Sequence, residues 1–411
     1  MRRRPAGSIF ALVCVLVFGA CGRPSESSGG QSNSDTGSSA SKVATLSGEA
    51  IPIGIAVAQT SDIALVGQEQ VVGARVAEQF FNQRGGVNGR PIKLVFQDTG
   101  DNEPGAINAF QALIQAGVVG IVGPSLSQQA FAADPTAEAA GVPVLAPSNT
   151  AEGIPQIGNY IARVSAPVAR VAPLAVEQAL AMEPAIKTVA VAYARNDVFA
   201  TSETNTFQRA VRGKGLNLTT VQTFQTSDTD FTTQANNLLS KKPQLIIVSG
   251  LTVDGGNLVK HLRELGYKGL MIAGNGLNTT SVFPVCGKSC DGVLIAQAYN
   301  PKTDNEVNKA FLEAHIKSQR KQPLQFTAQT FAAVQVFVDA LGRLDMEKRL
   351  TGLELKTLRS ELNQAILRGK YETPLGPIAF DPEGEVVQDA FFVAQIKMNP
   401  DGHTGEFNFV R

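Results

Sequence analysis

The sequence has no excess of charge of either sign, because 36 lysine and arginine residues stand against 36 aspartate and glutamate residues. It therefore has no basic stripe of the kind that indicates nucleic acid as a partner. The apolar run near its start, Ile9–Ala20, is too short to span a bilayer as a helix. No G-x-S-x-G motif occurs, and no G-x-G-x-x-G follows an expected strand, so nothing favours a hydrolase or a dinucleotide-dependent enzyme.

Cysteine and histidine are also scarce, with four and three copies. The histidines are scattered along the chain and lie in no evident catalytic triad, so we expect no catalysis, no metal and no cofactor. Cys14 and Cys21 belong to an N-terminal export segment, which leaves only Cys286 and Cys290. An isolated pair in an exported protein favours a small disulfide loop over a metal site, which would need two further ligands.

The chain begins with features of an export signal. Residues 1–20 combine three arginines with the apolar run and are typical of a signal peptide. They end in Phe18-Gly19-Ala20-Cys21, which resembles a bacterial lipobox, with Phe18 where leucine is usual. We predict that Cys21 is lipidated; the alternative is a secreted protein cleaved nearby, in which Cys21 has no role. Residues 21–49 are rich in serine and glycine and predict a flexible tether. The protein is thus expected to be exported and membrane-anchored, facing the periplasm or the cell exterior.

The rest of the chain alternates between strand and helix, which predicts parallel βαβ units. It is long enough for two domains. We expect strands at 51–57, 91–97, 118–122, 142–146, 160–164, 187–193, 216–224, 244–249, 269–273 and 293–298. We expect helices at 66–83, 103–115, 167–181, 200–212, 231–239, 254–265, 305–317, 327–344 and 353–367. A further helix should follow the possible capping residues 125–127 and continue towards Gly141. The end changes to antiparallel strands, 376–380 and 388–396, separated by the turn 381–384.

Two loops rich in hydroxyl groups follow neighbouring expected strands. The first contains Ser125 and Ser127 and opens a helix, and the second contains Ser148 and Thr150. Ligands of open α/β sheets bind outside the carboxyl ends of the strands, and a helix N-terminus attracts anions. The loops therefore indicate a site for a small anionic group. The alternative is that these serines are ordinary helix caps and turn residues.

The ordered set of motifs resembles the branched-chain amino-acid-binding proteins, which are type I periplasmic binding proteins that deliver ligand to ABC importers. The resemblance covers nearly all of 52–410. It is carried by ALVGQEQVVGARVAEQFFNQRGGVNGRPIKLVFQDTGDNEPGAINAF at 64–110, GIVGPSLS, VPVLAPSNT, YIARVSAP at 160–167 and GPIAFDPEGEVV at 376–387.

The resemblance implies an α/β fold of two Rossmann-like lobes joined by a three-strand hinge, with ligand enclosed between the lobes. Lobe 1 would be 50–164 plus 299–370, and lobe 2 would be 165–298 plus 371–411. The implied function is an extracytoplasmic solute-binding lipoprotein that captures an amino acid or a similar small solute. Its implied partners are the ligand, a transporter permease and the membrane. A ligand-sensing protein of the same fold, signalling to a membrane receptor, stays open as the alternative.

The resemblance also implies roles for individual residues of the first lobe. The Ser127 hydroxyl and backbone N–H groups would bind the ligand carboxylate, with Ser125 nearby. The Ser148 carbonyl and Thr150 would bind the ammonium group. Val66 matches a position that packs against the ligand side chain.

The second lobe departs from the family pattern. Phe199 and Leu251 replace positions that are often tyrosine. The family's acidic partner of the ammonium group should fall near Asn275, within 274–277, where no carboxylate occurs. Asp197 and Asp254 lie on neighbouring loops, and each either replaces that acid or only caps a helix. Because a buried ammonium needs a charged or fully hydrogen-bonded partner, other amino acids, small carboxylates and amides remain open as ligands.

Overall fold

The structure, a computed structural model, describes residues 46–411. The predicted signal peptide, Cys21 and the predicted tether as far as residue 45 lie outside the described residues. No helix within 46–411 combines the length and the apolar character needed to cross a membrane.

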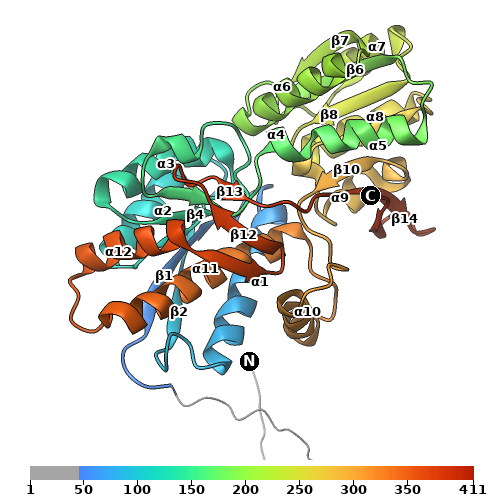
Figure 1. Cartoon of the computed structure of the whole chain (residues 1–411). Helices are drawn as coiled ribbons and strands as arrows, with labels where there is room; N and C mark the ends of the chain where they lie inside the picture. Colours follow the sequence, from blue (N-terminus) through green and yellow to red (C-terminus); the bar gives the residue numbers. More distant parts are fainter. Residues whose placement is uncertain (1–45) are drawn as a thin grey trace, which may run out of the picture. The chain divides into compact units, whose positions relative to one another are not determined.

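A five-stranded parallel sheet comes first in the chain (Figure 1), with strand order β2-β1-β3-β4-β5. Its central strands are buried, as expected for a parallel sheet with helices on its faces. The elements are β1 Ile51–Val57, α1 Ala64–Gln83, β2 Ile92–Asp98, α2 Glu103–Gln115, β3 Ile121–Val122, α3 Ser127–Ala140, β4 Val144–Ala146, η1 Pro155–Ile157 and β5 Ile161–Arg163.

A seven-stranded sheet follows, with strand order β15-β14-β10-β9-β8-β6-β7. Its strands from β6 to β10 pair in parallel, and β14 joins β10 antiparallel. The elements are α4 Val168–Val171, α5 Pro173–Met182, β6 Thr188–Ala194, α6 Val198–Gly213, β7 Asn217–Phe224, α7 Thr232–Ser240, β8 Leu245–Ser249, α8 Thr252–Glu264, β9 Leu270–Ala273, η2 Asn275–Leu277, α9 Val282–Cys286, η3 Gly287–Cys290, β10 Leu294–Gln297, β14 Phe392–Met398 and β15 Gly405–Phe409.

Three helices and a small antiparallel sheet complete the chain. They are α10 Glu306–Gln319, α11 Gln325–Lys348, α12 Leu355–Arg368, β11 Lys370–Thr373, β12 Gly376–Phe380 and β13 Val386–Val387. Helix α11 packs against α1 and α12, and the small sheet contacts these returning helices (Figure 1). A Cβ atom on Gly73 of α1 would lie 2.3 Å from the Thr327 carbonyl oxygen of α11. Glycine is therefore required for this close helix contact.

Two predictions about secondary structure are wrong. The helix expected at 167–181 is divided into α4 and α5, because Pro173 has no N–H to continue the helical hydrogen bonds. The strand expected at 388–396 does not pair across the turn at 381–384. Strand β12 pairs there with the short β13, and the later β14 pairs with β10 in the seven-stranded sheet. The Gln388 amide bonds the Ala298 carbonyl at 2.8 Å and redirects the chain between those two sheets.

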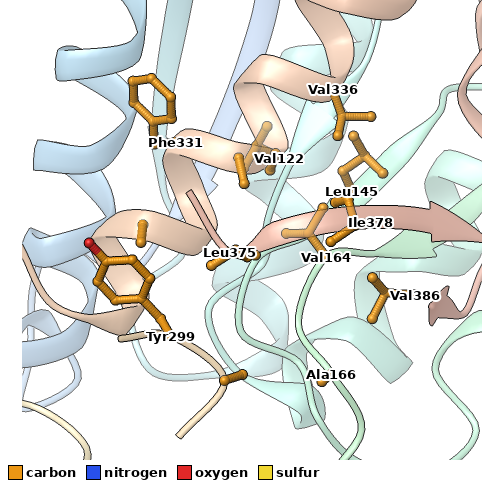
Figure 2. Packing of buried hydrophobic residues seen from close by; sticks show 14 of the residues in the cluster. Val122, Leu145, Val164, Ala166, Tyr299, Phe331, Val336, Leu375, Ile378 and Val386 are labelled. Atoms are coloured by element: carbon orange, nitrogen blue, oxygen red, sulfur yellow. The ribbon is translucent and has the colours of Figure 1, made fainter. Parts of the chain in front are cut away.

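The largest hydrophobic cluster joins the first sheet to α11 and to the small sheet. Figure 2 shows Val122 and Leu145, from neighbouring strands, close to Val336 of α11 and Ile378 of β12. Each of these side chains is at most 2% exposed. Burying such a side chain contributes about 1.5–3 kcal/mol, so this cluster fixes α11 over the sheet.

Arg163 connects the small sheet to the loop after β4. Its guanidinium is 1% exposed, pairs with Glu385 and donates to the Asn149 and Ala151 carbonyls at 3.0 and 2.6 Å. A buried guanidinium requires this many partners, because leaving its charge unpaired would be costly. The pair therefore holds the backbone on both sides of Thr150 in place.

Candidate functional site

The two hydroxyl-rich loops lie side by side at the carboxyl ends of β3 and β4. The Ser148 hydroxyl donates to the Ser125 carbonyl at 2.6 Å, and the Asn149 amide donates to the Pro124 carbonyl at 3.1 Å. The Ser127 hydroxyl accepts from the Ala151 N–H at 3.3 Å. Because neighbouring parallel strands end at the same edge, two loops distant in sequence form one surface.

Gln70 of α1 connects these two loops through its side chain, a role that we did not predict from the sequence. Its side chain is fully buried, donates to the Ser148 hydroxyl at 2.8 Å and accepts from the Ser125 hydroxyl. The Ser125 oxygen also accepts from the Ala58 N–H at 2.9 Å. The hydroxyls of Ser125 and Ser148 are therefore already used to position backbone.

The N-terminus of α3 is not capped by a serine. Leu126 occupies the N-cap position without a side-chain bond, and Ser127 is the first helical residue. The leading N–H groups of a helix have no partner within the helix and bind anions well. This geometry goes against the alternative in which Ser125 and Ser127 are helix caps.

One cavity, here called the serine cavity, combines these loops with residues following strands of the second sheet. Seven of the nine predicted ligand-binding residues line it: Val66, Ser125, Ser127, Ser148, Phe199, Leu251 and Asn275. The other lining residues are Ile63, Leu126, Thr252, Gly276 and Phe326. Its volume is about 40 Å³, which is a small space with donors on one side and apolar groups on the other.

Thr150 and Asp254, the other two predicted residues, line adjacent cavities. The glutamate cavity contains Thr150 and Glu203 and shares Asn275 with the serine cavity. The aspartate cavity contains Asp254 and Asp197 and shares Leu251 with the serine cavity; its volume is about 250 Å³. The serine cavity therefore shares lining residues with each of the other two, which share none with each other.

Hydrogen bonds across the site hold its two sides together. Gln325 of α11 donates to the Asn275 side chain at 2.8 Å, and the Thr279 hydroxyl donates to Glu69 of α1 at 2.6 Å. At another edge, the Glu152 N–H donates to the Ser202 hydroxyl at 3.0 Å. These contacts connect residues of the first sheet, α1 and α11 to residues of the second sheet and its helices.

Asp197 and Asp254 differ in what they contact. Asp197 accepts from the Ala200 N–H at 2.7 Å and so caps α6, while burial raises its pKa to about 6. Asp254 lies in the first turn of α8, is 2% exposed, and neither carboxyl oxygen has a partner of good hydrogen-bond geometry. Burial, together with the nearby Asp197 charge, raises the Asp254 pKa to about 7, and backbone N–H groups, first that of Gly255, oppose the rise. The capping alternative therefore fits Asp197 better than Asp254.

Glu203 of α6 is an acid in the site that we did not predict. It is 1% exposed, and its Oε1 accepts from the Asn275 N–H at 2.8 Å. Burial raises its pKa to about 7, and the Asn275 N–H and the Ser249 hydroxyl oppose that rise. Neither Glu203 Oε2 nor Ser249 Oγ has a partner of good hydrogen-bond geometry. Its only signal in the sequence is a position one helical turn after Phe199.

The three cavities contain carboxylates but no lysine, arginine or histidine among their described lining residues. Within residues 46–411, no group of acidic, histidine and cysteine side chains is arranged to hold a metal ion. Cys286 and Cys290 are joined in a disulfide, with Cα atoms 5.5 Å apart, and neither lines these cavities.

Comparison with known proteins identifies the family. Residues 50–404 match the family described as periplasmic binding protein. The chain belongs to the periplasmic binding protein family. The resemblance to branched-chain amino-acid-binding proteins is confirmed, and so is the α/β fold of the type I periplasmic binding proteins. Proteins of this family are substrate-binding proteins of the extracytoplasmic space rather than enzymes, so a solute-binding role follows for this chain.

Three relatives illustrate the range of this family. A leucine-, isoleucine-, valine-, threonine- and alanine-binding protein of Pseudomonas aeruginosa is 23% identical over 353 residues, which are 85% of this chain and 90% of that protein. A branched-chain amino acid transporter substrate-binding protein from Streptococcus pneumoniae, solved with isoleucine, is 20% identical with a TM-score of 0.77, covering 88% of this chain and 99% of that one. A solute-binding protein of an ABC transporter from R. palustris, solved with benzoate, is 20% identical with a TM-score of 0.75, covering 88% and 96%. At this identity the structural likeness shows the fold alone.

Proposed function

We propose that this periplasmic binding protein is a membrane-tethered lipoprotein of an ABC importer that captures an amino acid or a related small polar solute. The observation that carries the proposal is the serine cavity, in which the uncapped N-terminus of α3 faces residues that follow strands of the second sheet. Such a closed site removes nearly all water from a small ligand. Lipidation of Cys21 would supply the tether.

Different site residues bind different parts of the ligand. The N–H groups at the start of α3 and the Ser127 hydroxyl bind a carboxylate, since they are the donors without a strong partner. The Ser148 carbonyl and Thr150 bind the opposite, donor-rich end. The apolar side chains of Val66, Phe199 and Leu251 enclose the remainder. Asn275 lies where the serine and glutamate cavities meet. Asp254 faces the outer end, in the aspartate cavity.

We further propose that release requires two lobes to separate. Lobe 1 comprises 50–164 plus 299–370, and lobe 2 comprises 165–298 plus 371–411, except that the small sheet moves with lobe 1. Strands β11 and β12 contact α10, α11 and α12, and Glu385 pairs with Arg163. Opening then requires rotation about the segments that pass between the lobes, a hinge motion of the kind common in ligand-closing folds.

Binding of a solute panel to the full chain in detergent tests the proposal. Amino acids, small carboxylates, amides and sugars would be screened by thermal shift, because a ligand at one hundred times its Kd stabilises by about 2.7 kcal/mol. Affinity would then be measured by calorimetry for Ser127→Ala and Thr150→Ala, each expected to lose about 1–3 kcal/mol because a buried charged partner is left unsatisfied.

Ser318→Ala is the matched control, because its hydroxyl bonds only neighbours on α10, donating to the His315 carbonyl and accepting from the Gln319 amide, and lines none of the three cavities. It should bind like the wild type. Full affinity in both site variants would refute the site assignment. Absence of binding across the panel would refute the importer role and favour a sensor.

A further inference from the structure

The glutamate cavity contains three buried oxygen atoms without a hydrogen-bond partner. They are Thr150 Oγ1 from the loop after β4, Glu203 Oε2 from α6 and Gln329 Oε1 from α11. Their residues are 4%, 1% and 1% exposed. Buried polar atoms almost always have partners, so three orphaned acceptors in one cavity indicate a missing donor.

The protein itself offers little to satisfy them, since the nearby Ser249 hydroxyl forms no bond of good geometry with Glu203. Both ends of the Gln325 amide are already bonded, to the Asn275 side chain at 2.8 Å and to the Ala298 N–H at 2.6 Å. The described lining of the cavity includes no cationic side chain. A carboxylate that is ionised in so dry a place requires a compensating charge. The missing group is therefore a cation that donates hydrogen bonds.

The size of the cavity restricts that group. Its volume is about 20 Å³, close to the minimum that holds one water molecule, and an ammonium group is of similar size. A water molecule donates two hydrogen bonds and carries no charge. A primary ammonium donates three, which matches the three orphaned acceptors and neutralises Glu203.

Gly274 explains why the acid comes from helix α6. A Cβ atom on Gly274 would lie 1.7 Å from Glu203 Oε2, so the carboxyl group occupies the space of a side chain at position 274. No acid occurs at 274–277, the position where the family resemblance placed one. The Glu203 carboxyl is fixed over this glycine by its bond to the Asn275 N–H.

We propose that Glu203, together with Thr150 and Gln329, binds the primary ammonium group of the ligand. This inference rests on the proposed solute-binding function and names the ligand class: α-amino acids, to the exclusion of simple carboxylates and aromatic acids. Asp197 does not take this part, because it caps α6, and Asp254 does not, because it lines the aspartate cavity, which shares no lining residue with the glutamate cavity.

The assignment also connects recognition to closure. Thr150 follows a strand of the first sheet, whereas Glu203 belongs to a helix of the second. An ammonium group between them bonds both sides at once. A ligand without this group leaves Glu203 uncompensated, so it gains less from the closed arrangement than an amino acid does.

The test compares ligand pairs that differ only in the amino group. L-leucine and 4-methylpentanoate form one pair, and each amino acid that binds is matched with its deaminated acid. We expect the wild type to prefer the amino acid at least about 30-fold, and Glu203→Gln to lose at least about 30-fold in affinity for it. Asp134→Asn is the matched control, since Asp134 is equally buried and unpartnered but lines none of the three cavities. It should bind like the wild type.

A relocation variant separates the charge from its position. In Glu203→Ala with Gly274→Asp, the aspartate carboxyl lies one bond beyond a Cβ that would nearly coincide with the original oxygen. It should recover affinity relative to Glu203→Ala alone. Wild-type affinity in a folded Glu203→Gln variant, or a wild-type preference for deaminated acids, would overturn the inference and leave the solute-binding function intact. Failure of the wild type to bind either member of any pair would overturn the proposed function as well.

Discussion

Replacing Glu203 with glutamine should stabilise the ligand-free protein at pH 8 while it weakens ligand binding. Glu203 is 1% exposed, and burial raises its pKa from 4.5 to about 7. A function that requires a buried acid thus carries a cost in stability when the ligand is absent. Glutamine keeps the shape and the acceptor for the Asn275 N–H but cannot ionise.

The sign of the effect follows from proton linkage. Below pH 4.5 the carboxyl is protonated in both the folded and unfolded states, and its favourable contribution to stability is fully present. Between pH 4.5 and about 7 the unfolded chain loses the proton first, so this contribution is lost as pH rises through the folded-state pKa. Each pKa unit corresponds to about 1.4 kcal/mol, so a rise from 4.5 to about 7 gives a difference of about 3 kcal/mol between pH 4 and pH 8.

Thermal unfolding of the wild type and Glu203→Gln at pH 4 and pH 8, without ligand, measures this difference. We expect nearly equal Tm values at pH 4 and a variant more stable by about 3 kcal/mol at pH 8, which is about 4 °C for a body of this size. Other buried acids, among them Asp254, titrate in the same range and are present in both proteins, so their contributions largely cancel. Asp197 is different, because its charge contributes to the raised pKa of Glu203 and is therefore part of the effect that is measured. A variant less stable than the wild type at pH 8 would refute the conclusion that the charge is uncompensated.

Three further predictions concern affinity and stability. Binding of an amino acid should be about tenfold weaker at pH 6 than at pH 8, because Glu203, with a pKa of about 7, must ionise to bind ammonium. Calorimetry on Glu203→Gln should show a Kd that depends less on pH. Arg163→Met should lower the free energy of unfolding, measured in urea, by about 2–4 kcal/mol, because Glu385 then lacks its partner. Adding Glu385→Gln should recover part of this loss. An unchanged urea midpoint in Arg163→Met would contradict a structural role. Reduction of the disulfide between Cys286 and Cys290 should cost no more than about 2 kcal/mol because the closed loop is so short, and a larger drop in Tm would show that this loop organises more of the fold.

The helices, the strands and the edge of the sheet where the two hydroxyl-rich loops lie were predictable from local sequence patterns. Apolar β-branched runs and helical periodicity marked the strands and helices, because burial on both faces of a parallel sheet leaves a plain pattern in the sequence. Ser127 and Ser148 were placed together by the same logic, since neighbouring parallel strands end at one edge. One predicted helix, at 167–181, is two helices in the structure because Pro173 interrupts it.

The tertiary structure alone decided which distant side chains meet. Gln70 and Glu203 lie within helices whose local pattern gives no reason to expect a polar residue in the core, and their partners are far away in sequence. The space beside Gly274 holds a carboxylate only because the Glu203 side chain of α6 extends to this residue, which follows β9. Likewise β14 joins the second sheet because the chain turns at Gln388. Periodicity in the sequence shows which residues are buried. Packing between elements determines which residues they are buried against, and the position of Glu203 in this site depends on that packing.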